Sequence, residues 1–130
     1  MTTPHTGEHF TTPAAAESRL RYLDNEMTKA ELRLREARDA EVDRKHEYEA
    51  AKRRAFLSAE CPKPTRGGYT VADREVWVDD QCADEQRAYD IAVAAREAAQ
   101  DHHRTVRDQA MVAMALLRSG STAFNMSGVS

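Results

Sequence analysis

The stretch Cys61-Pro62-Lys63-Pro64-Thr65-Arg66-Gly67-Gly68 constrains the fold of this chain more than any other feature. Proline has no amide hydrogen to continue a helix and paired glycines favour turns, so a helix that reaches this stretch must end there. Charge-laced helical patterns lie on both sides of it. The sequence therefore predicts a hairpin of two antiparallel helices.

Local signals set the expected boundaries of this hairpin. We expect a flexible N-terminal tail over 1–13, a first helix over 14–60, a turn over 61–69, a second helix over 70–118 and a C-terminal tail over 119–130. Pro13 is tolerated at a helix start, and Thr70 with Asp73 forms a short-armed capping box. Arg118 and Gly120 supply the stop signals of the second helix.

Composition limits what such a hairpin can do. Of 130 residues 32% are charged and 6% aromatic, and the net charge is −3, which excludes a globally basic nucleic-acid binder but allows a local basic patch. Two helices lying side by side cannot enclose a core, so we expect an all-α, coiled-coil-like homo-oligomer. No signal peptide or apolar run of membrane-spanning length is evident, and we expect a cytoplasmic protein without a membrane partner.

Apolar residues recur at spacings of three and four along both helices, which is the pattern of a coiled-coil seam. In the second helix the predicted seam includes several alanines, which allow close helix approach. The residues expected in the seam or in oligomer contacts are Leu20, Leu23, Met27, Leu34, Ala92, Ala95, Ala99, Val106, Leu116, Leu117 and Phe124.

A hairpin that closes near residue 65 also predicts which residues face each other. Arg44 and Glu85 then fall opposite one another, where they either pair as a polar layer that fixes the register or both point outward into solvent. Cys82 falls opposite about Tyr48. Its sulfur would then lie on the order of 20 Å from that of Cys61, so no intrachain disulfide is expected.

No constellation of residues indicates catalysis or a metal site. His46-Glu47 begins a zinc-protease motif, but Ala50 stands where the second histidine is required. His102 and His103 are adjacent and therefore point about 100° apart on a helix, with no third ligand on one face. We expect no enzyme, no metal and no cofactor.

The end of the hairpin carries the clearest functional signal. Between Arg44 and Arg74 there are eight basic residues against four acidic ones, with aromatic residues among them. Cations that follow a phosphate backbone and rings that stack on bases are what sequence-independent single-strand binding requires. The alternative is that the acidic start of the second helix neutralises this patch, and that Phe56 and Trp77 pack on each other. The candidate nucleic-acid contacts are Lys45, Lys52, Arg53, Arg54, Lys63, Arg66, Tyr69 and Arg74.

The order of these features resembles the small phage recombination mediators of the UvsY type. The likeness covers Lys52 to Phe124: the run Arg53-Arg54-Ala55-Phe56-Leu57-Ser58, a glycine-bearing turn, and a second long helix that closes on Leu117-Arg118-Ser119. The resemblance implies a ring-forming helical hairpin that helps load a recombinase onto single-stranded DNA. It implies DNA contacts at Lys52, Arg53, Arg54 and Arg66, and oligomer contacts at Leu116, Leu117 and Phe124.

Two hypotheses of function follow. In the first, the chain is a non-catalytic, oligomeric phage protein that binds single-stranded DNA and partners a recombinase in DNA recombination. In the second, it is a structural or regulatory coiled coil that binds another protein, such as a phage assembly factor or an inhibitor of a host protein.

Overall fold

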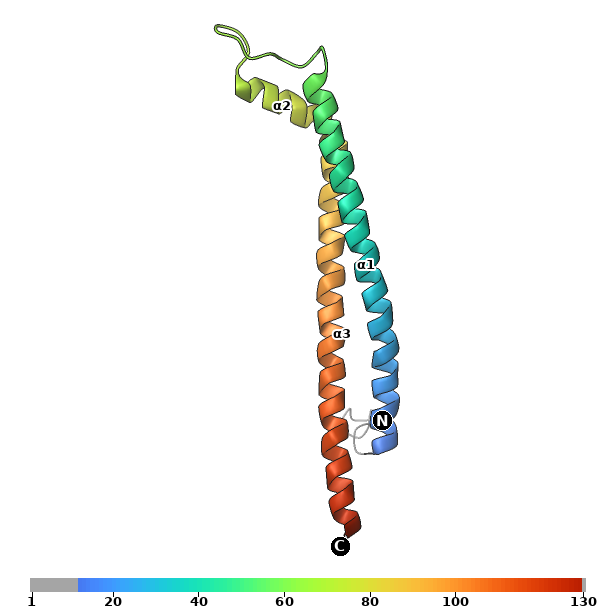
Figure 1. Cartoon of the computed structure of the whole chain (residues 1–130). Coiled ribbons are helices and arrows are strands. Elements are labelled where there is room, and N and C mark those ends of the chain that lie inside the picture. The colour runs from blue at the N-terminus through green and yellow to red at the C-terminus, as the bar shows by residue number, and fades with distance from the viewer. Residues whose placement is uncertain (1–11, 130) are drawn as a thin grey trace, which may run out of the picture. The chain divides into compact units, whose positions relative to one another are not determined.

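The chain is built from helices. The computed structural model describes the backbone of residues 12–129 and the side chains of residues 12–120. In this range the chain forms α1 (Pro13–Leu57), α2 (Val71–Gln81) and α3 (Ala83–Val129), and no strand, as Figure 1 shows. The predicted all-α class is therefore confirmed. Most of the expected N-terminal tail, residues 1–11, lies outside the described part.

Both ends of α1 follow from local chemistry. Thr12 Oγ1 accepts a hydrogen bond from the amide of Ala15 (3.2 Å), and Pro13 takes the first helical position, where its missing amide costs nothing. At the other end, the amides of Ser58 and Cys61 donate to carbonyls only three residues earlier. The chain thus tightens out of the α-helix at Leu57, three residues before the predicted end.

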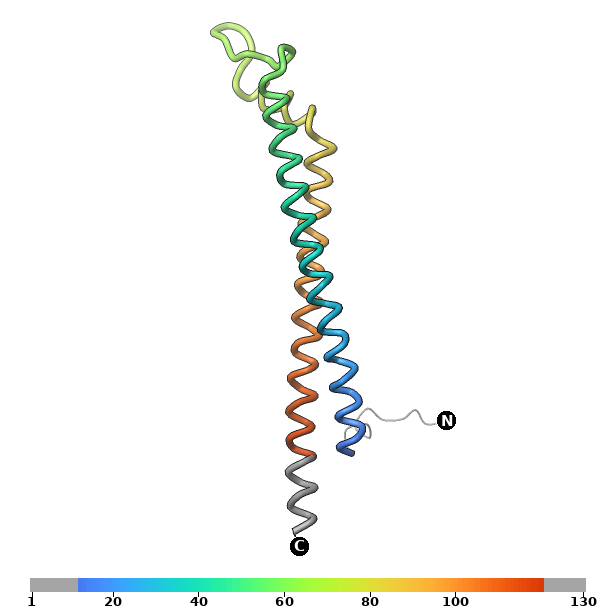
Figure 2. The backbone as a smooth tube through the Cα atoms, turned by 45° about the vertical axis from the view of Figure 1, so that its right-hand side comes forward, coloured from blue at the N-terminus to red at the C-terminus, as the bar shows by residue number. Residues whose placement is uncertain are grey.

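Residues 58–70 form the connection that follows α1, and Figure 2 shows them as a looped segment. The turn within it is closed by the amide of Gly68, which donates to the carbonyl of Thr65 (3.1 Å), and by the amide of Thr65, which donates to Tyr69 (3.0 Å). Gly67 adopts a φ of 80°, in the left-handed region that favours glycine. A side chain at Gly68 would clash with Thr65 Oγ1, so both glycines suit the predicted break between the helices.

The single second helix expected over 70–118 is instead two helices. α2 ends at Gln81, Cys82 takes a non-helical backbone (φ −113°, ψ 24°), and α3 begins at Ala83. Figure 1 shows α2 set across the neighbouring ends of α1 and α3. The break brings Val78 and Cys82 into one buried cluster with Ala51, Ala55 and Cys61. Burial in this cluster explains a break that neither proline nor glycine marks.

The predicted helix end near residue 118 is also wrong, because α3 continues to Val129. A glycine ends a helix when it turns left-handed, and among the described residues only Gly67 has a positive φ. Gly120 therefore stays helical, at a cost of about 1 kcal/mol relative to alanine. Phe124 lies in the part of α3 whose side chains are not described.

The chain divides into two compact units, with the boundary after Leu34 on α1 and before Ala99 on α3. In each unit a part of α1 packs antiparallel on a part of α3. The first unit buries Ala16, Leu23, Ala30, Leu34, Val106 and Ala113. The second unit buries Ala92 together with the cluster of Ala51, Ala55, Cys61, Val78 and Cys82.

The seam of α3 agrees with the predicted one in part. Ala92, Ala99, Val106 and Leu117 are buried or half-buried as expected, but Arg96 takes the place predicted for its neighbour Ala95. The buried or half-buried residues of the seam are Cys82, Glu85, Tyr89, Ala92, Arg96, Ala99, His103, Val106, Ala110, Ala113 and Leu117. Ala95 and Leu116 are correspondingly exposed.

Polar contacts with α1 explain why Arg96 and His103 lie in this seam. In the second unit Arg96 Nε donates to Glu41 Oε2 at 2.9 Å, and this hydrogen bond raises the pKa of Arg96 above its ordinary value. In the first unit His103 Nε2 lies 3.8 Å from Glu31 Oε1. The flexible stems of such side chains can lie along the seam while their polar ends reach a partner on the opposite helix.

The predicted pair of Arg44 with Glu85 is wrong. Arg44 is exposed and binds Glu47 on its own helix at 2.9 Å, while Glu85 Oε2 is buried without a hydrogen-bond partner. Tyr48, expected opposite Cys82, stacks instead on Tyr89. In the second unit the register is thus displaced by about two helical turns, because α2 lengthens the connection between the paired helices.

The observed register can be tested by charge exchange. We expect Glu41→Arg to lower the thermal midpoint, since it places two cations at one seam position, and Glu41→Arg with Arg96→Glu to restore most of the loss. Arg44→Glu is the control, because it removes only a contact within one exposed helix turn. Thermal unfolding followed by circular dichroism measures all three. Equal effects of Glu41→Arg and Arg44→Glu would contradict this register.

The start of α2 offers a second stability test. The predicted capping box is confirmed: Thr70 Oγ1 accepts from the amide of Asp73 (3.1 Å), and Asp73 Oδ2 accepts from the amide of Thr70 (2.8 Å). We expect Thr70→Ala to cost about 1 kcal/mol, and Thr70→Ser to cost much less because serine keeps the acceptor. Amide hydrogen exchange in α2 would report the loss. Equal exchange in both variants would refute the role of the cap.

None of the helices in the described part has an apolar stretch long enough to cross a membrane.

Candidate nucleic-acid interface

The basic patch predicted from the sequence gathers at one end of the second unit. We call residues 52–74 the tip. It comprises the last turns of α1, the connection 58–70 and the start of α2. Lys52, Arg53 and Arg54 are exposed on α1, Lys63 and Arg66 are exposed in the connection, and Arg74 is half-buried on α2. Lys45 is also exposed but lies about two helical turns before the tip.

The cations of the tip are not neutralised by ion pairs. The side chains of Lys52, Arg53, Arg54, Lys63, Arg66 and Arg74 form no ion pair with any carboxylate among the described residues. Ion pairs form elsewhere on α1 and α3. At the acidic start of α2, the Asp73 carboxylate accepts the hydrogen bond of the capping box and pairs with no cation of the tip. No direct contact therefore supports the alternative that the acidic start of α2 neutralises the basic patch.

Two cations and two apolar side chains line a shallow hollow on the last turns of α1. Its lining residues are Lys52, Arg53, Phe56 and Leu57. Phe56 is 49% exposed and Leu57 84%, the largest exposure among the large hydrophobic residues of the described chain. Spacings of four residues place Lys52 beside Phe56 and Arg53 beside Leu57 on the helix surface. An anionic ligand with apolar faces matches this surface.

Arg74 covers part of Phe56. The guanidinium carbon lies 4.6 Å from the centre of the ring, within the range of a cation–π contact. The Nε atom of Arg74 is buried and has no hydrogen-bond partner. The contact joins α2 to the end of α1, and it leaves the half-exposed Phe56 less ring surface for a stacked base.

The aromatic residues near the tip divide into two kinds. Tyr48 stacks on Tyr89, with ring centres 6.1 Å apart, and Trp77 packs against the buried cysteine cluster, so both serve packing. Lys52 lies over the ring of Tyr48, 5.2 Å from its centre. Only Phe56 and Tyr69, which is 59% exposed, remain available for stacking. The alternative predicted from the sequence paired Phe56 with Trp77, whereas in the structure the ring of Phe56 lies under Arg74.

The two cysteines lie together, contrary to the expected separation. Cys61 and Cys82 belong to the same buried cluster, and both are free thiols. Cys82 Sγ donates to the carbonyl of Val78 at 2.9 Å. Burial raises the pKa of the Cys82 thiol, and the nearby carboxylates Asp79 and Glu85 raise it further. This thiol stays protonated at neutral pH and serves packing.

The predicted seam residues also separate by role. Leu23, Leu34, Ala92 and Val106 are buried inside the chain, and Ala99 and Leu117 are partly buried. Leu20 and Met27 are partly buried beside a groove, Leu116 is 37% exposed and lines a second hollow with Leu23, and Ala95 is exposed. Sequence reasoning did not select Leu57. The sequence pattern that could have indicated Leu57 is its position four residues after Arg53, which places both side chains on one face of the helix.

In the described part, no group of three histidine, cysteine or acidic side chains is placed to hold a metal ion. No family model, curated protein or solved structure matches this chain.

Proposed function

We propose that this chain is a non-catalytic, self-associating helical protein that binds single-stranded DNA through its tip and assists a recombinase. The observation that carries the proposal is the tip itself: it holds six cations without a carboxylate partner among the described residues, and two of them, Lys52 and Arg53, line a hollow with the exposed Phe56 and Leu57. Unpaired cations release counterions when they meet phosphates, which is the main source of sequence-independent affinity.

A single strand suits this surface better than a duplex. A duplex keeps its bases stacked inside, whereas a single strand offers base faces to Phe56 and Tyr69 and phosphates to the surrounding cations. The tip has neither an exposed recognition helix with base-reading side chains nor a uniformly basic face. We therefore expect little dependence on base sequence.

The direct test uses the full chain and fluorescently labelled strands. Fluorescence anisotropy at low salt should show binding to a thymine single strand and weaker binding to a duplex of the same length. The logarithm of the affinity should fall linearly with the logarithm of salt concentration. An absence of single-strand binding at low salt would refute the proposal. Assistance to a recombinase, which rests on the resemblance to recombination mediators, is tested by strand exchange with and without the chain.

A protein partner is the second candidate, favoured by the exposure of Leu57 and of Val76, which is 69% exposed on α2. Binding to a protein partner through these side chains would depend on apolar area and would weaken little with salt. The salt dependence of binding therefore distinguishes the two functions.

A further inference from the structure

The stretch 110–117 of α3 is apolar on every side. Eight consecutive apolar residues, Ala110 to Leu117, cover more than two helical turns, so they cannot all face one neighbouring helix. α1 covers only one side of this stretch: Ala113 is buried, whereas Met111, Val112 and Met114 are 62%, 59% and 41% exposed. A helix that is apolar all round is normally enclosed on more sides than this.

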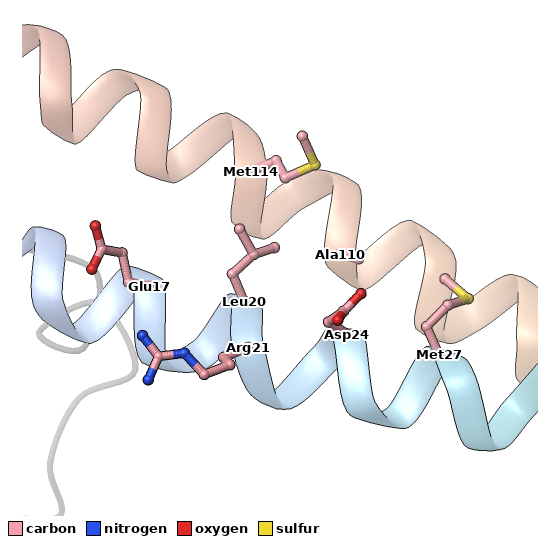
Figure 3. A pocket seen from close by; sticks show the side chains of 7 residues that line it. All are labelled: Glu17, Leu20, Arg21, Asp24, Met27, Ala110 and Met114. Carbon is pink, nitrogen blue, oxygen red and sulfur yellow. The ribbon is translucent and has the colours of Figure 1, made fainter.

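A groove runs along one flank of this helix pair in the first unit. Its apolar lining comes from Leu20 and Met27 of α1 and from Ala110 and Met114 of α3. Figure 3 shows Leu20, Asp24 and Met27 pointing from α1 towards α3, whereas Arg21 extends along α1. The groove thus combines an apolar lining with charged side chains contributed by α1. We call it the Leu20–Met114 groove.

The charged side chains that α1 contributes to this groove are arranged so that the groove can pair with a second copy of itself. Arg21 stands between Glu17, four residues before it, and Asp24, three residues after it. None of these three side chains forms an ion pair with a described residue, although other charged residues of the same unit do, such as Lys29 with Glu26 at 3.4 Å. In a two-fold symmetric interface the same surface occurs on both sides. A cation between two anions can therefore pair with a second copy of itself.

We propose that two copies of this chain dock antiparallel through their Leu20–Met114 grooves, with Arg21 of each copy against Asp24 of the other. Two helix pairs then surround one apolar core, as in a four-helix bundle, which a single pair cannot form. The proposal rests on the self-association in the proposed function and specifies its surface. It does not depend on DNA binding, because the groove and the tip belong to different units.

The charges are tested by exchange. Sedimentation equilibrium of the full chain should show a dimer at micromolar concentration. Arg21→Asp and Asp24→Arg should each weaken the dimer roughly tenfold or more, because each change removes two symmetric ion pairs and opposes like charges. The double variant, Arg21→Asp with Asp24→Arg, should return the dissociation constant to within about threefold of the parent. Both positions are exposed, so the fold should persist in every variant.

The apolar lining is tested by two methionines on the same helix. Met114→Gln should weaken the dimer, whereas Met111→Gln should not, because Met111 is exposed outside the groove. A parent chain that stays monomeric at about 100 μM, or single variants that dimerise like the parent, would overturn the proposal. A double variant that fails to recover would overturn the Arg21–Asp24 pairing. Binding of single-stranded DNA by a monomeric variant would show that the DNA proposal holds even where the dimer proposal fails.

Discussion

Replacement of Lys52, Arg53 and Arg54 together by alanine should reduce the affinity for single-stranded DNA roughly tenfold or more at low salt. Each cation that meets a phosphate contributes about 0.7 to the salt slope for a single strand, so the slope should flatten by about 2. All three side chains are exposed and form no ion pair among the described residues, so their removal should leave the fold intact. Fluorescence anisotropy over a salt series measures both quantities.

The matched control is the triple replacement of Arg33, Arg35 and Arg38 by alanine. These residues are also exposed cations of α1 without an ion pair in the described chain, and their removal changes the net charge equally. If net charge alone governed binding, both triple variants would weaken it alike. We expect the control to keep most of the affinity and the slope, because its cations lie away from the tip. Equal losses would argue against a local interface.

Replacement of Leu23 by alanine should have the largest effect on stability. Leu23 is 2% exposed and is among the largest fully buried side chains in the described chain, within a core otherwise made mostly of alanine. Its truncation removes apolar contacts and leaves a cavity, at a cost of about 2–3 kcal/mol.

Leu32→Ala is the control for this change, because Leu32 lies on the same helix but is 52% exposed. It should change the free energy of unfolding by less than about 0.5 kcal/mol. Urea unfolding at a fixed protein concentration, followed by circular dichroism, compares the two variants. Fixing the concentration matters because dimerisation contributes to the apparent stability. Similar midpoints for both variants would show that Leu23 does not anchor the first unit.

Features governed by neighbouring residues could be predicted from the sequence. The start of α1, the break after it and the capping box of α2 depend on residues at most a few positions apart. The exposure of Lys52, Arg53 and Arg54 followed in the same way, because charged side chains on a helix remain in solvent unless they find partners. These were the parts of the candidate site that sequence reasoning placed well.

Features that depend on partners distant in the chain were missed. The sequence predicts Ala95 in the seam because it is apolar and falls at the expected spacing. The structure places Arg96 and His103 there, because Glu41 and Glu31 stand opposite them. The same limit applies to Arg74. No local sequence pattern indicates that the guanidinium of Arg74 covers Phe56, because the two residues meet only when α2 packs against the end of α1.

The sequence by itself determined that this chain is helical, where its first helix begins, and that cations gather near residues 52–74. These properties follow from backbone propensity, capping and composition, which act over a few residues. Only the tertiary structure decided the register of α1 against α3, the break at Cys82 and the union of the two cysteines in one cluster. Such features arise because burial of small side chains between distant segments outweighs the local preference of residues 70–118 for one continuous helix.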